Sequence, residues 1–296
     1  MTRPEENTGN LTEADATELL AARYGAENAP RTTPAPLTET IANQLRHRSV
    51  RRWLARDVDE ATLTAILSAA QSAATSSNKQ TVSVVAVRDP ATKQGLAEAA
   101  RQMAGHIARA PVVLVWLVDH SRARLLAARA AAGGEAPDLG GLGYLEEVLA
   151  SVTDVGIAAQ AAVDAAESMG LGTVYLGSLR NDVPRVRELV GAPRDVVPVL
   201  GLAIGHPDPE EKADTKPRLP LELFAHRDRY VDCRTDPEAA AALAAYDETL
   251  AGYYSRYGAH SAWSDQLLGR LSEKAATKTT RHLLREEFNR SGYGLR

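Results

Sequence analysis

The chain of 296 residues has little of what several common kinds of protein need. Its single cysteine, Cys233, excludes an internal disulfide and a cysteine-rich metal cluster. No apolar run approaches the roughly 20 residues of a membrane span, and the best run, Pro111 to Val118, has the length of a strand. The start, Met1 to Asn10, is polar and lacks the apolar core of a signal peptide. These absences predict a soluble, cytoplasmic protein that does not enter a membrane.

Excess charge and several well-known motifs are also missing. A net charge of -4 and an isoelectric point near 6.0 give no electrostatic reason to expect nucleic-acid binding. Without a G-x-G-x-x-G or a G-x-x-x-x-G-K-[ST] loop, neither a classical dinucleotide fold nor a P-loop enzyme is supported. The seven histidines form no H-E-x-x-H pair, and no G-x-S-x-G elbow occurs. The sequence therefore predicts neither a metal site nor an α/β-hydrolase.

The pattern of apolar residues predicts helices and strands that alternate. Helical spacing covers Leu11–Tyr24, Leu37–His47, Asp59–Ala70, Leu149–Met169, Val186–Val190 and much of the chain after Asp236. Apolar or β-rich runs predict strands over Thr81–Val87, Pro111–Val118, Thr173–Gly177 and Val196–Gly205. Pro111–Val118 is apolar enough for a strand buried on both faces. The segment Arg122 to Gly143 gives weak helix and loop patterns and is a candidate mobile lid.

Composition predicts three parts along the chain. Residues 1–36 are expected to be an N-terminal extension that ends in a proline-rich linker, Ala29 to Pro36. Residues 37–235 are expected to form the compact core. Residues 236–296 are helical and charged, which suggests an arm that packs on the core or embraces a partner.

Three polar segments adjoin the ends of predicted elements. They are His47-Arg48-Ser49-Val50-Arg51, Thr75-Ser76-Ser77-Asn78-Lys79-Gln80 and Lys216-Pro217-Arg218. The mixture of cations, hydroxyls and amides suits a phosphorylated cofactor with a flat, hydrogen-bonding ring, and flavin mononucleotide (FMN) is the first candidate. By its spacing alone, the Lys-Pro-Arg turn is more typical of a solvated surface turn than of a binding site. A further loop, Tyr175 to Arg180, has Gly177-Ser178 where a backbone can approach a ligand closely.

Taken in order, these segments resemble the bacterial oxygen-insensitive nitroreductases and flavin reductases, and most of all their NADPH-preferring subgroup. Ala166 to Asn181 is similar to the most recognisable stretch of that family. Lys216 to Pro220, Tyr246 to Glu248 and Trp263 to Asp265 follow in the same order. The resemblance covers Ile41 to Arg296 and implies an α+β fold with a central mixed β-sheet flanked by helices. It also implies a homodimer with FMN at the subunit interface and exchanged C-terminal helical arms.

The resemblance assigns FMN-binding roles residue by residue. His47, Arg48 and Ser49 would lie near the phosphate, with Lys216 and Arg218 as the main cationic clamp.

Other residues are assigned to the rest of the cofactor. Arg51 would face the pyrimidine edge of the flavin, where a guanidinium stabilises the reduced ring. Thr75, Ser76 and Asn78 would bond the ribityl chain and ring edge, some of them from the second subunit. The reactive face would be lined by Tyr175, Leu176, Gly177 and Ser178.

The implied reaction is ping-pong. NADPH or NADH would transfer a hydride to FMN and leave, and a small-molecule electron acceptor such as a nitroaromatic, a quinone or free flavin would then bind. No residue is assigned as catalytic, because stacking, orientation and electrostatics would suffice. The loop implied for the NADPH 2'-phosphate is short here and keeps Arg256 as its candidate contact. Ala276 stands where the resemblance implies a substrate-side arginine.

Two other readings of the same fold remain open at this point. A specialised biosynthetic flavoenzyme would oxidise a pathway intermediate and return electrons to oxygen, and the altered nicotinamide loop motivates it. A non-enzymatic flavin-binding protein would hold FMN without turnover. A soluble α/β domain without flavin is the remaining alternative.

Overall fold

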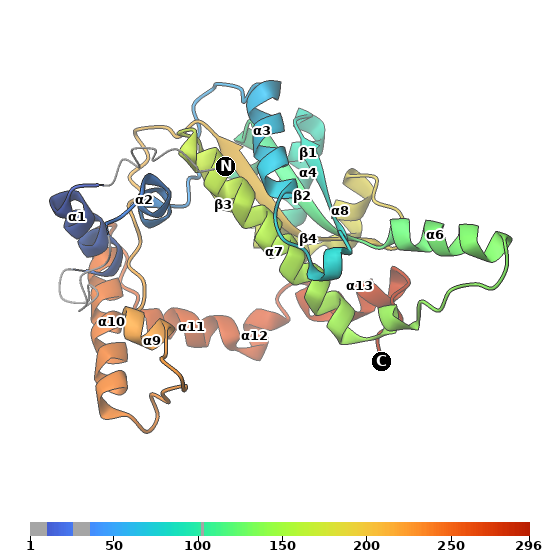
Figure 1. Cartoon of the computed structure of the whole chain (residues 1–296). Helices are drawn as coiled ribbons and strands as arrows, with labels where there is room; N and C mark the ends of the chain where they lie inside the picture. The colour runs from blue at the N-terminus through green and yellow to red at the C-terminus, as the bar shows by residue number, and fades with distance from the viewer. Residues whose placement is uncertain (1–10, 26–35, 102–103) are drawn as a thin grey trace, which may run out of the picture. The chain divides into compact units, whose positions relative to one another are not determined.

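The computed structural model describes residues 11–25, 36–101 and 104–296, which divide into two compact units (Figure 1). The helical unit comprises Met1–Arg48 and Ala213–Ala275, and the sheet unit comprises Ser49–Lys212 and Ala276–Arg296. The polar start and all but Pro36 of the proline-rich linker lie outside the described residues. The division of the chain predicted after residues 36 and 235 stays a prediction.

The sheet unit is built on four strands in the order β1-β2-β4-β3. Their bounds are β1 Val82–Val87, β2 Val112–Asp119, β3 Gly172–Tyr175 and β4 Val196–Gly205. Every pairing between these strands is antiparallel, so the prediction of a mixed sheet is wrong. Among the described residues, one isolated β-bridge, between Ser49 and Thr173, is parallel. The prediction that β2 is buried on both faces is confirmed along its whole length.

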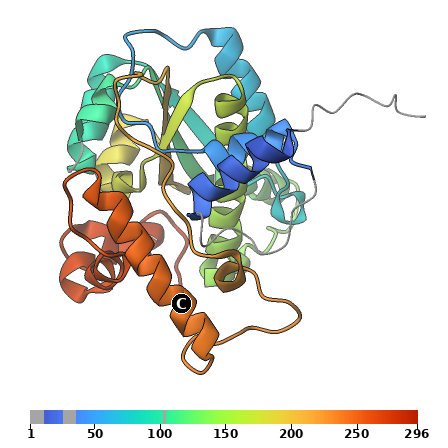
Figure 2. The same cartoon turned by 90° about the vertical axis from the view of Figure 1, so that its left-hand side faces the viewer.

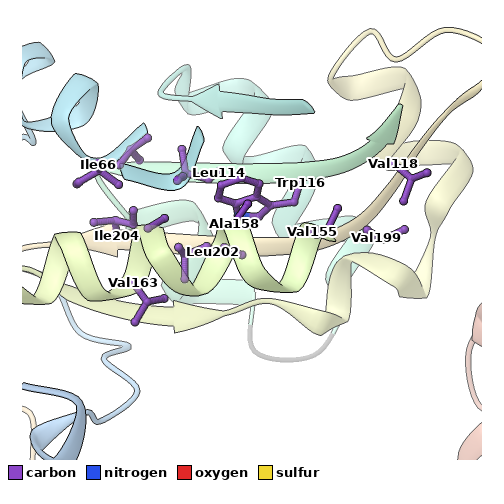
Figure 3. Packing of buried hydrophobic residues seen from close by; sticks show 14 of the residues in the cluster. Ile66, Leu114, Trp116, Val118, Val155, Ala158, Val163, Val199, Leu202 and Ile204 are labelled. Atoms are coloured by element: carbon purple, nitrogen blue, oxygen red, sulfur yellow. The ribbon is translucent and has the colours of Figure 1, made fainter. Parts of the chain in front are cut away.

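Helices cover both faces of this sheet, as the two views in Figures 1 and 2 show. One face packs on α3 (Glu60–Gln71) and α7 (Leu145–Ser168), with Trp116 of β2 between sheet and helix (Figure 3). The other face packs on α4 (Pro90–Ala100), α5 (Ala104–Arg109) and α8 (Val183–Leu189). The remaining elements are η2 Ser76–Asn78, α6 Ser121–Ala132, η3 Gly140–Gly143, η4 Gly177–Asn181, η5 Thr280–Leu283 and α13 Leu284–Arg290.

Capping residues explain where the two helices over the first face begin or end. The Asp59 side chain accepts a hydrogen bond from the Thr62 N–H, so the predicted N-cap of α3 is confirmed. After α7, Gly170 has a φ of 76°, the left-handed conformation expected of it. By length and composition α7 could span a membrane, but 44% of its most apolar window is buried inside the unit, as in a core helix.

A close backbone approach places the segment after residue 48 beside β3. The Val50 N–H donates to the Thr173 carbonyl at 2.8 Å. A Cβ on Gly172 would lie 2.6 Å from Cγ2 of Val50, so only glycine allows this contact. Ser49 and Arg51 are thereby held next to the strand that leads into the Tyr175 loop.

The helical unit contains α1 Glu13–Tyr24, α2 Glu39–Arg46, α9 Leu221–Phe224, α10 Pro237–Ser255 and α11 Trp263–Leu271, while α12 Glu273–Ala276 leads out of it. Two of the motifs that carry the family resemblance pack against each other here. The rings of Tyr246 and Trp263 meet edge to face at 5.5 Å. Asp247 accepts hydrogen bonds from the Ser264 N–H and hydroxyl at 2.7 and 2.6 Å, and these bonds lower the pKa of its carboxyl. Asp247 of α10 therefore fixes the start of α11.

Candidate functional site

Arg23 organises the cationic segments of the helical unit. Only 5% of its surface is exposed. Its guanidinium donates to the carbonyls of Leu45, His47 and Lys216 at 2.6 to 3.0 Å. Its own carbonyl accepts from the Arg218 N–H at 2.8 Å. One buried arginine thus fixes the main chain of both predicted phosphate-binding segments of this unit.

The result is that predicted phosphate contacts far apart in the sequence line common cavities. His47 and Arg218 line a cavity of about 260 Å³ together with Arg23. Lys216 and Arg218 line a second cavity of about 540 Å³, whose other walls are mostly aromatic and aliphatic. Lys216 Nζ lies 5.2 Å from the centre of the Tyr254 ring, a cation–π contact that keeps its charge near that cavity.

Tyrosines of α10 hold the segment that carries these cations. The Tyr246 hydroxyl donates to the Pro217 carbonyl at 3.3 Å, and the Tyr253 hydroxyl donates to the Asp214 carbonyl at 3.0 Å. Burial raises the pKa of both phenols, that of Tyr253 to about 12 with a further contribution from Tyr257, so both remain donors at neutral pH. Arg256 lies 5.0 Å over the Tyr253 ring and 3.6 Å from the Asp214 carboxylate. The candidate 2'-phosphate contact is therefore exposed but already paired.

In the sheet unit, Arg51 follows the segment fixed beside β3. Its main-chain N–H donates to Glu211 at 2.9 Å, and its guanidinium reaches the Ser49 carbonyl at 3.3 Å. Burial, assisted by the charges of Arg51 and Arg109, lowers the pKa of His106. Arg51 thus places a positive charge in a partly buried region beside β3.

The Thr75–Gln80 loop has an unusual backbone that a buried carboxylate holds in place. Ser77, Asn78 and Gln80 all have φ near 50°, which non-glycine residues rarely adopt and which is typical of ligand-binding loops. The Ser76 N–H donates to both oxygens of Asp154 of α7 at 2.9 and 3.0 Å, and its hydroxyl donates at 3.0 Å. Asp154 is 1% exposed. The Ser76 hydroxyl proton is therefore already used within the protein, which leaves its oxygen as an acceptor.

A second carboxylate of α7 fixes the other end of this loop. Lys79 Nζ lies 2.7 Å from Glu147, which also bonds His120 at 3.0 Å. The other ring nitrogen of His120 bonds the Tyr293 hydroxyl at 2.8 Å. Burial acts to raise the pKa of Glu147, but hydrogen bonds from Lys79 and His120 outweigh burial and lower it. Glu147 is therefore an anion that restrains Lys79.

The loop after β3 is held by the C-terminal tail of the same unit. Leu176 is buried and its N–H donates to the Gly201 carbonyl at 2.7 Å. Arg281 donates to the Gly177 carbonyl at 3.0 Å and to the Asn181 side chain at 2.6 Å. Ser178 lies in the 3₁₀ turn between these anchors. The predicted flavin-facing residues thus lie on a short, braced turn.

Helix α7 also links this turn to the Thr75–Gln80 loop. The Tyr175 hydroxyl donates to Gln160 of α7 at 3.2 Å, and Ser76 bonds Asp154 of the same helix. Six residues along a helix correspond to about 9 Å. The two predicted flavin-binding segments are therefore both attached to α7.

Three residues that shape the candidate site were missed in the sequence. Asp154 had a detectable pattern, because it lies in the buried stripe of an alanine-rich helix where an acid requires a partner. Arg23 and Arg281 had no detectable pattern in the sequence, since each bonds carbonyl groups that are far away in the chain. Arg281, five residues beyond Ala276, is the tail arginine that reaches the Gly177 loop.

Comparison with known proteins agrees with this arrangement. The model of the nitroreductase family matches residues 45–206, and that of the nitroreductase family C-terminal domain matches residues 216–296. An NADPH-dependent oxidoreductase of Staphylococcus epidermidis is 36% identical over 250 residues, which cover 83% of this chain and 94% of the relative. An oxygen-insensitive NADPH nitroreductase of Salmonella typhimurium is 33% identical over 88% of this chain and all of the relative.

A solved structure gives the same result. The NADPH:FMN oxidoreductase from Vibrio harveyi complexed with NAD+ superimposes with a TM-score of 0.70 at 32% identity, covering 87% of this chain and 99% of that one. The α+β fold, with helices on both faces of an antiparallel sheet, is shared. The chain therefore belongs to the nitroreductase family.

Proposed function

We propose that this protein is an FMN-dependent NADPH oxidoreductase that reduces small-molecule acceptors, such as nitroaromatics, quinones or free flavin, by a ping-pong reaction. When bound, FMN would supply the two-electron redox chemistry that links the nicotinamide donor to the acceptor. Family membership and relatives named for NADPH and flavin support this activity. In this chain, the main support for the activity is the pair of cavities lined by His47, Lys216 and Arg218, whose main chain Arg23 holds in place.

The cationic residues of the helical unit fit the FMN phosphate. His47, Arg48, Lys216 and Arg218 would hold it, with Ser49 adding a hydroxyl from the start of the sheet unit. Because Arg23 fixes the backbone at His47, Lys216 and Arg218, little conformational entropy is lost when these groups bind an anion.

The residues of the sheet unit fit the ribityl chain and ring. Thr75, Asn78 and the acceptor oxygen of Ser76 would bond the ribityl hydroxyls and ring edge. Arg51 would stabilise negative charge at the pyrimidine edge. The braced turn of Tyr175, Leu176, Gly177 and Ser178 would support the reactive face. We assign no catalytic acid, because binding, orientation and fixed charge suffice for hydride transfer.

Arg256 would contact the 2'-phosphate of NADPH. Its guanidinium is exposed, and its ion pair with Asp214 is long at 3.6 Å, so a phosphate dianion competes well for it. NADPH is therefore the expected donor, and Arg256 the residue that separates it from NADH.

We further propose a cytoplasmic homodimer with exchanged C-terminal arms. Leu145, Leu149, Val152 and Ile157 of α7 are between 39 and 58% exposed, although the opposite side of the helix is buried in the core. A row of large exposed apolar side chains on one helix is typical of a protein interface. Sedimentation equilibrium that gives the monomer mass at micromolar concentration would contradict this.

A matched pair of double variants tests the phosphate assignment. Lys216→Ala with Arg218→Ala removes two charge-assisted contacts and should weaken FMN binding at least about a hundredfold, since each contact contributes about 1.5 to 3 kcal/mol. Arg227→Ala with Arg229→Ala removes two exposed cations at the same spacing in the same unit and should leave FMN binding unchanged. Fluorescence titration of the apoproteins with FMN measures both. Equal affinities for the two double variants would exclude the clamp.

A further inference from the structure

A cavity of about 540 Å³ opens in the sheet unit between α3, β1 and α7. Its inner walls are apolar and come from Leu67, Ala73, Val82 and Val84, which pack against the main core. Hydroxyl and amide side chains of α3 and of the Thr75–Gln80 loop form its rim. The cavity thus combines an apolar wall with polar side chains, and its volume lies in the range of small-molecule sites.

One polar group of this cavity is buried without a partner. Trp116 of β2 is 1% exposed and lines the cavity together with Ala158 of α7. Figure 3 shows its indole directed from the strand toward the helix, beside Ala158. Within the part of the chain that the structure describes, its Nε1–H has no hydrogen-bond acceptor. Because an unpaired buried donor is costly, an acceptor that enters this cavity is favoured.

The cavity offers no spare charge for an ionic ligand. Arg122, the cation in its lining, donates to the Asp119 carboxylate and the Ser83 hydroxyl at 3.0 Å. Its second terminal nitrogen donates to the carbonyls of Gln80 and Val82 at 2.7 and 3.1 Å. The Asp119 carboxylate balances the charge of this guanidinium and both of its terminal nitrogens are used, so the site favours neutral molecules.

We propose that this cavity binds a small, neutral, largely aromatic molecule that carries one hydrogen-bond acceptor, such as an aryl ketone, and that the Trp116 indole N–H donates to that acceptor. The apolar walls bury the ring, and the indole selects the carbonyl. This assignment goes beyond the proposed oxidoreductase activity and does not depend on it.

Occupancy of the cavity reaches the loop that carries Ser76 and Asn78. Thr75 and Gln80, the two ends of that loop, both line the cavity, and the Gln80 carbonyl accepts from Arg122. Gln80 also has a left-handed backbone with φ of 51°. A ligand in the cavity would therefore contact both ends of this loop.

Two aromatic probes of similar size test the proposal. Acetophenone has the acceptor carbonyl and ethylbenzene lacks it, and ligand-observed NMR titration of the purified full chain with its bound cofactor gives both affinities. We expect acetophenone to bind about threefold to tenfold more tightly, the gain from one net hydrogen bond. Trp116→Phe keeps the apolar ring, removes the N–H and should make the two affinities equal.

Cavity-filling variants locate the binding. Ala73→Leu, just after α3, fills the cavity and should abolish binding of both probes. Ala65→Leu, at an exposed position of α3 outside the cavity, should not. These variants decide the question even if Trp116→Phe does not fold. Equal affinities of the two probes in the unaltered protein, a ketone preference that survives Trp116→Phe, or binding that survives Ala73→Leu would each overturn the proposal.

Cofactor content separates this proposal from the proposed function. FMN absorbance is followed in the same titrations, and acetophenone should leave it unchanged. Release of FMN by acetophenone would place the probe in the cofactor site and overturn the cavity assignment. A preparation without flavin that keeps the ketone preference would contradict the proposed function alone.

Discussion

Replacement of Asp154 by alanine tests how the Thr75–Gln80 loop keeps its conformation. The Asp154 carboxylate, 1% exposed, accepts from the N–H and the hydroxyl of Ser76. The next residues, Ser77 and Asn78, and then Gln80, all have left-handed backbones. The carboxylate therefore holds the first residue of a segment that would otherwise relax.

The expected magnitude follows from the bonds and the backbone. A hydrogen bond to a charged acceptor contributes about 1.5 to 3 kcal/mol, so the two donors of Ser76 gain about 3 to 6 kcal/mol in total. Non-glycine residues in the left-handed region cost about 1 kcal/mol each at the low end, or about 3 kcal/mol for three. Because the two figures are similar, loss of the carboxylate releases the loop. The difference between the two figures leaves an expected loss of up to about 3 kcal/mol in the free energy of unfolding.

Urea unfolding of the apoprotein and FMN titration measure the two consequences. Asp154→Ala should lower both stability and FMN affinity, and Asp154→Asn, which keeps one acceptor oxygen, should lose about half as much stability. Glu146→Ala is the control, since it removes an exposed acid from the first turn of the same helix. An Asp154→Ala protein within 0.5 kcal/mol of the control, with unchanged FMN affinity, would refute the anchoring role.

The remaining predictions concern the nicotinamide and pH. Arg256→Ala should raise the KM for NADPH about threefold to tenfold and that for NADH little, because one exposed charge-assisted contact is lost. Arg270→Ala removes an exposed cation of the same unit and is the control. Equal effects of Arg256→Ala on the KM values of both donors would exclude Arg256 as the 2'-phosphate contact. Asp214→Ala should act in the opposite direction by freeing Arg256 from its ion pair, which steady-state kinetics will show. Burial and nearby Arg51 and Arg109 lower the pKa of His106 below its ordinary 6.5. Below pH 6.5 the unfolded chain therefore binds more protons than the folded protein, so the His106 contribution to stability is full above pH 6.5 and is lost as the pH drops toward the folded pKa. The urea midpoint should vary less between about pH 7.5 and 5 in His106→Gln than in the unaltered protein. Identical dependence of the midpoint on pH in the two proteins would contradict this.

Local features of the fold could be predicted from the sequence because neighbouring residues determine them. The Asp59 cap and the strand Val196–Gly205 agree with the structure. Helix α7 begins at Leu145 rather than at the predicted Leu149, because Glu146 and Glu147 suit its first turn. The prediction of a mixed sheet was wrong, since the relative direction of paired strands depends on how distant segments connect rather than on the local pattern.

The candidate site shows the same limit more strongly. The sequence placed cations and amides in plausible segments, but their anchors join residues separated by 78 positions for Ser76 and Asp154, and by 193 for Arg23 and Lys216. Such pairs form only when the tertiary fold brings them together. The weak helix expected after Arg122 is a regular helix from Ser121 to Ala132, and its role as a lid stays a prediction.

Anaerobic stopped-flow reduction of the purified protein tests the central claim most directly. The protein should carry a visible flavin absorption band that NADPH bleaches in one rapid phase, and a quinone or nitroaromatic added afterwards should restore it. NADH should bleach the band more slowly. A flavin band that neither nicotinamide bleaches would contradict the proposed oxidoreductase, and a protein that binds no flavin would contradict the site as well.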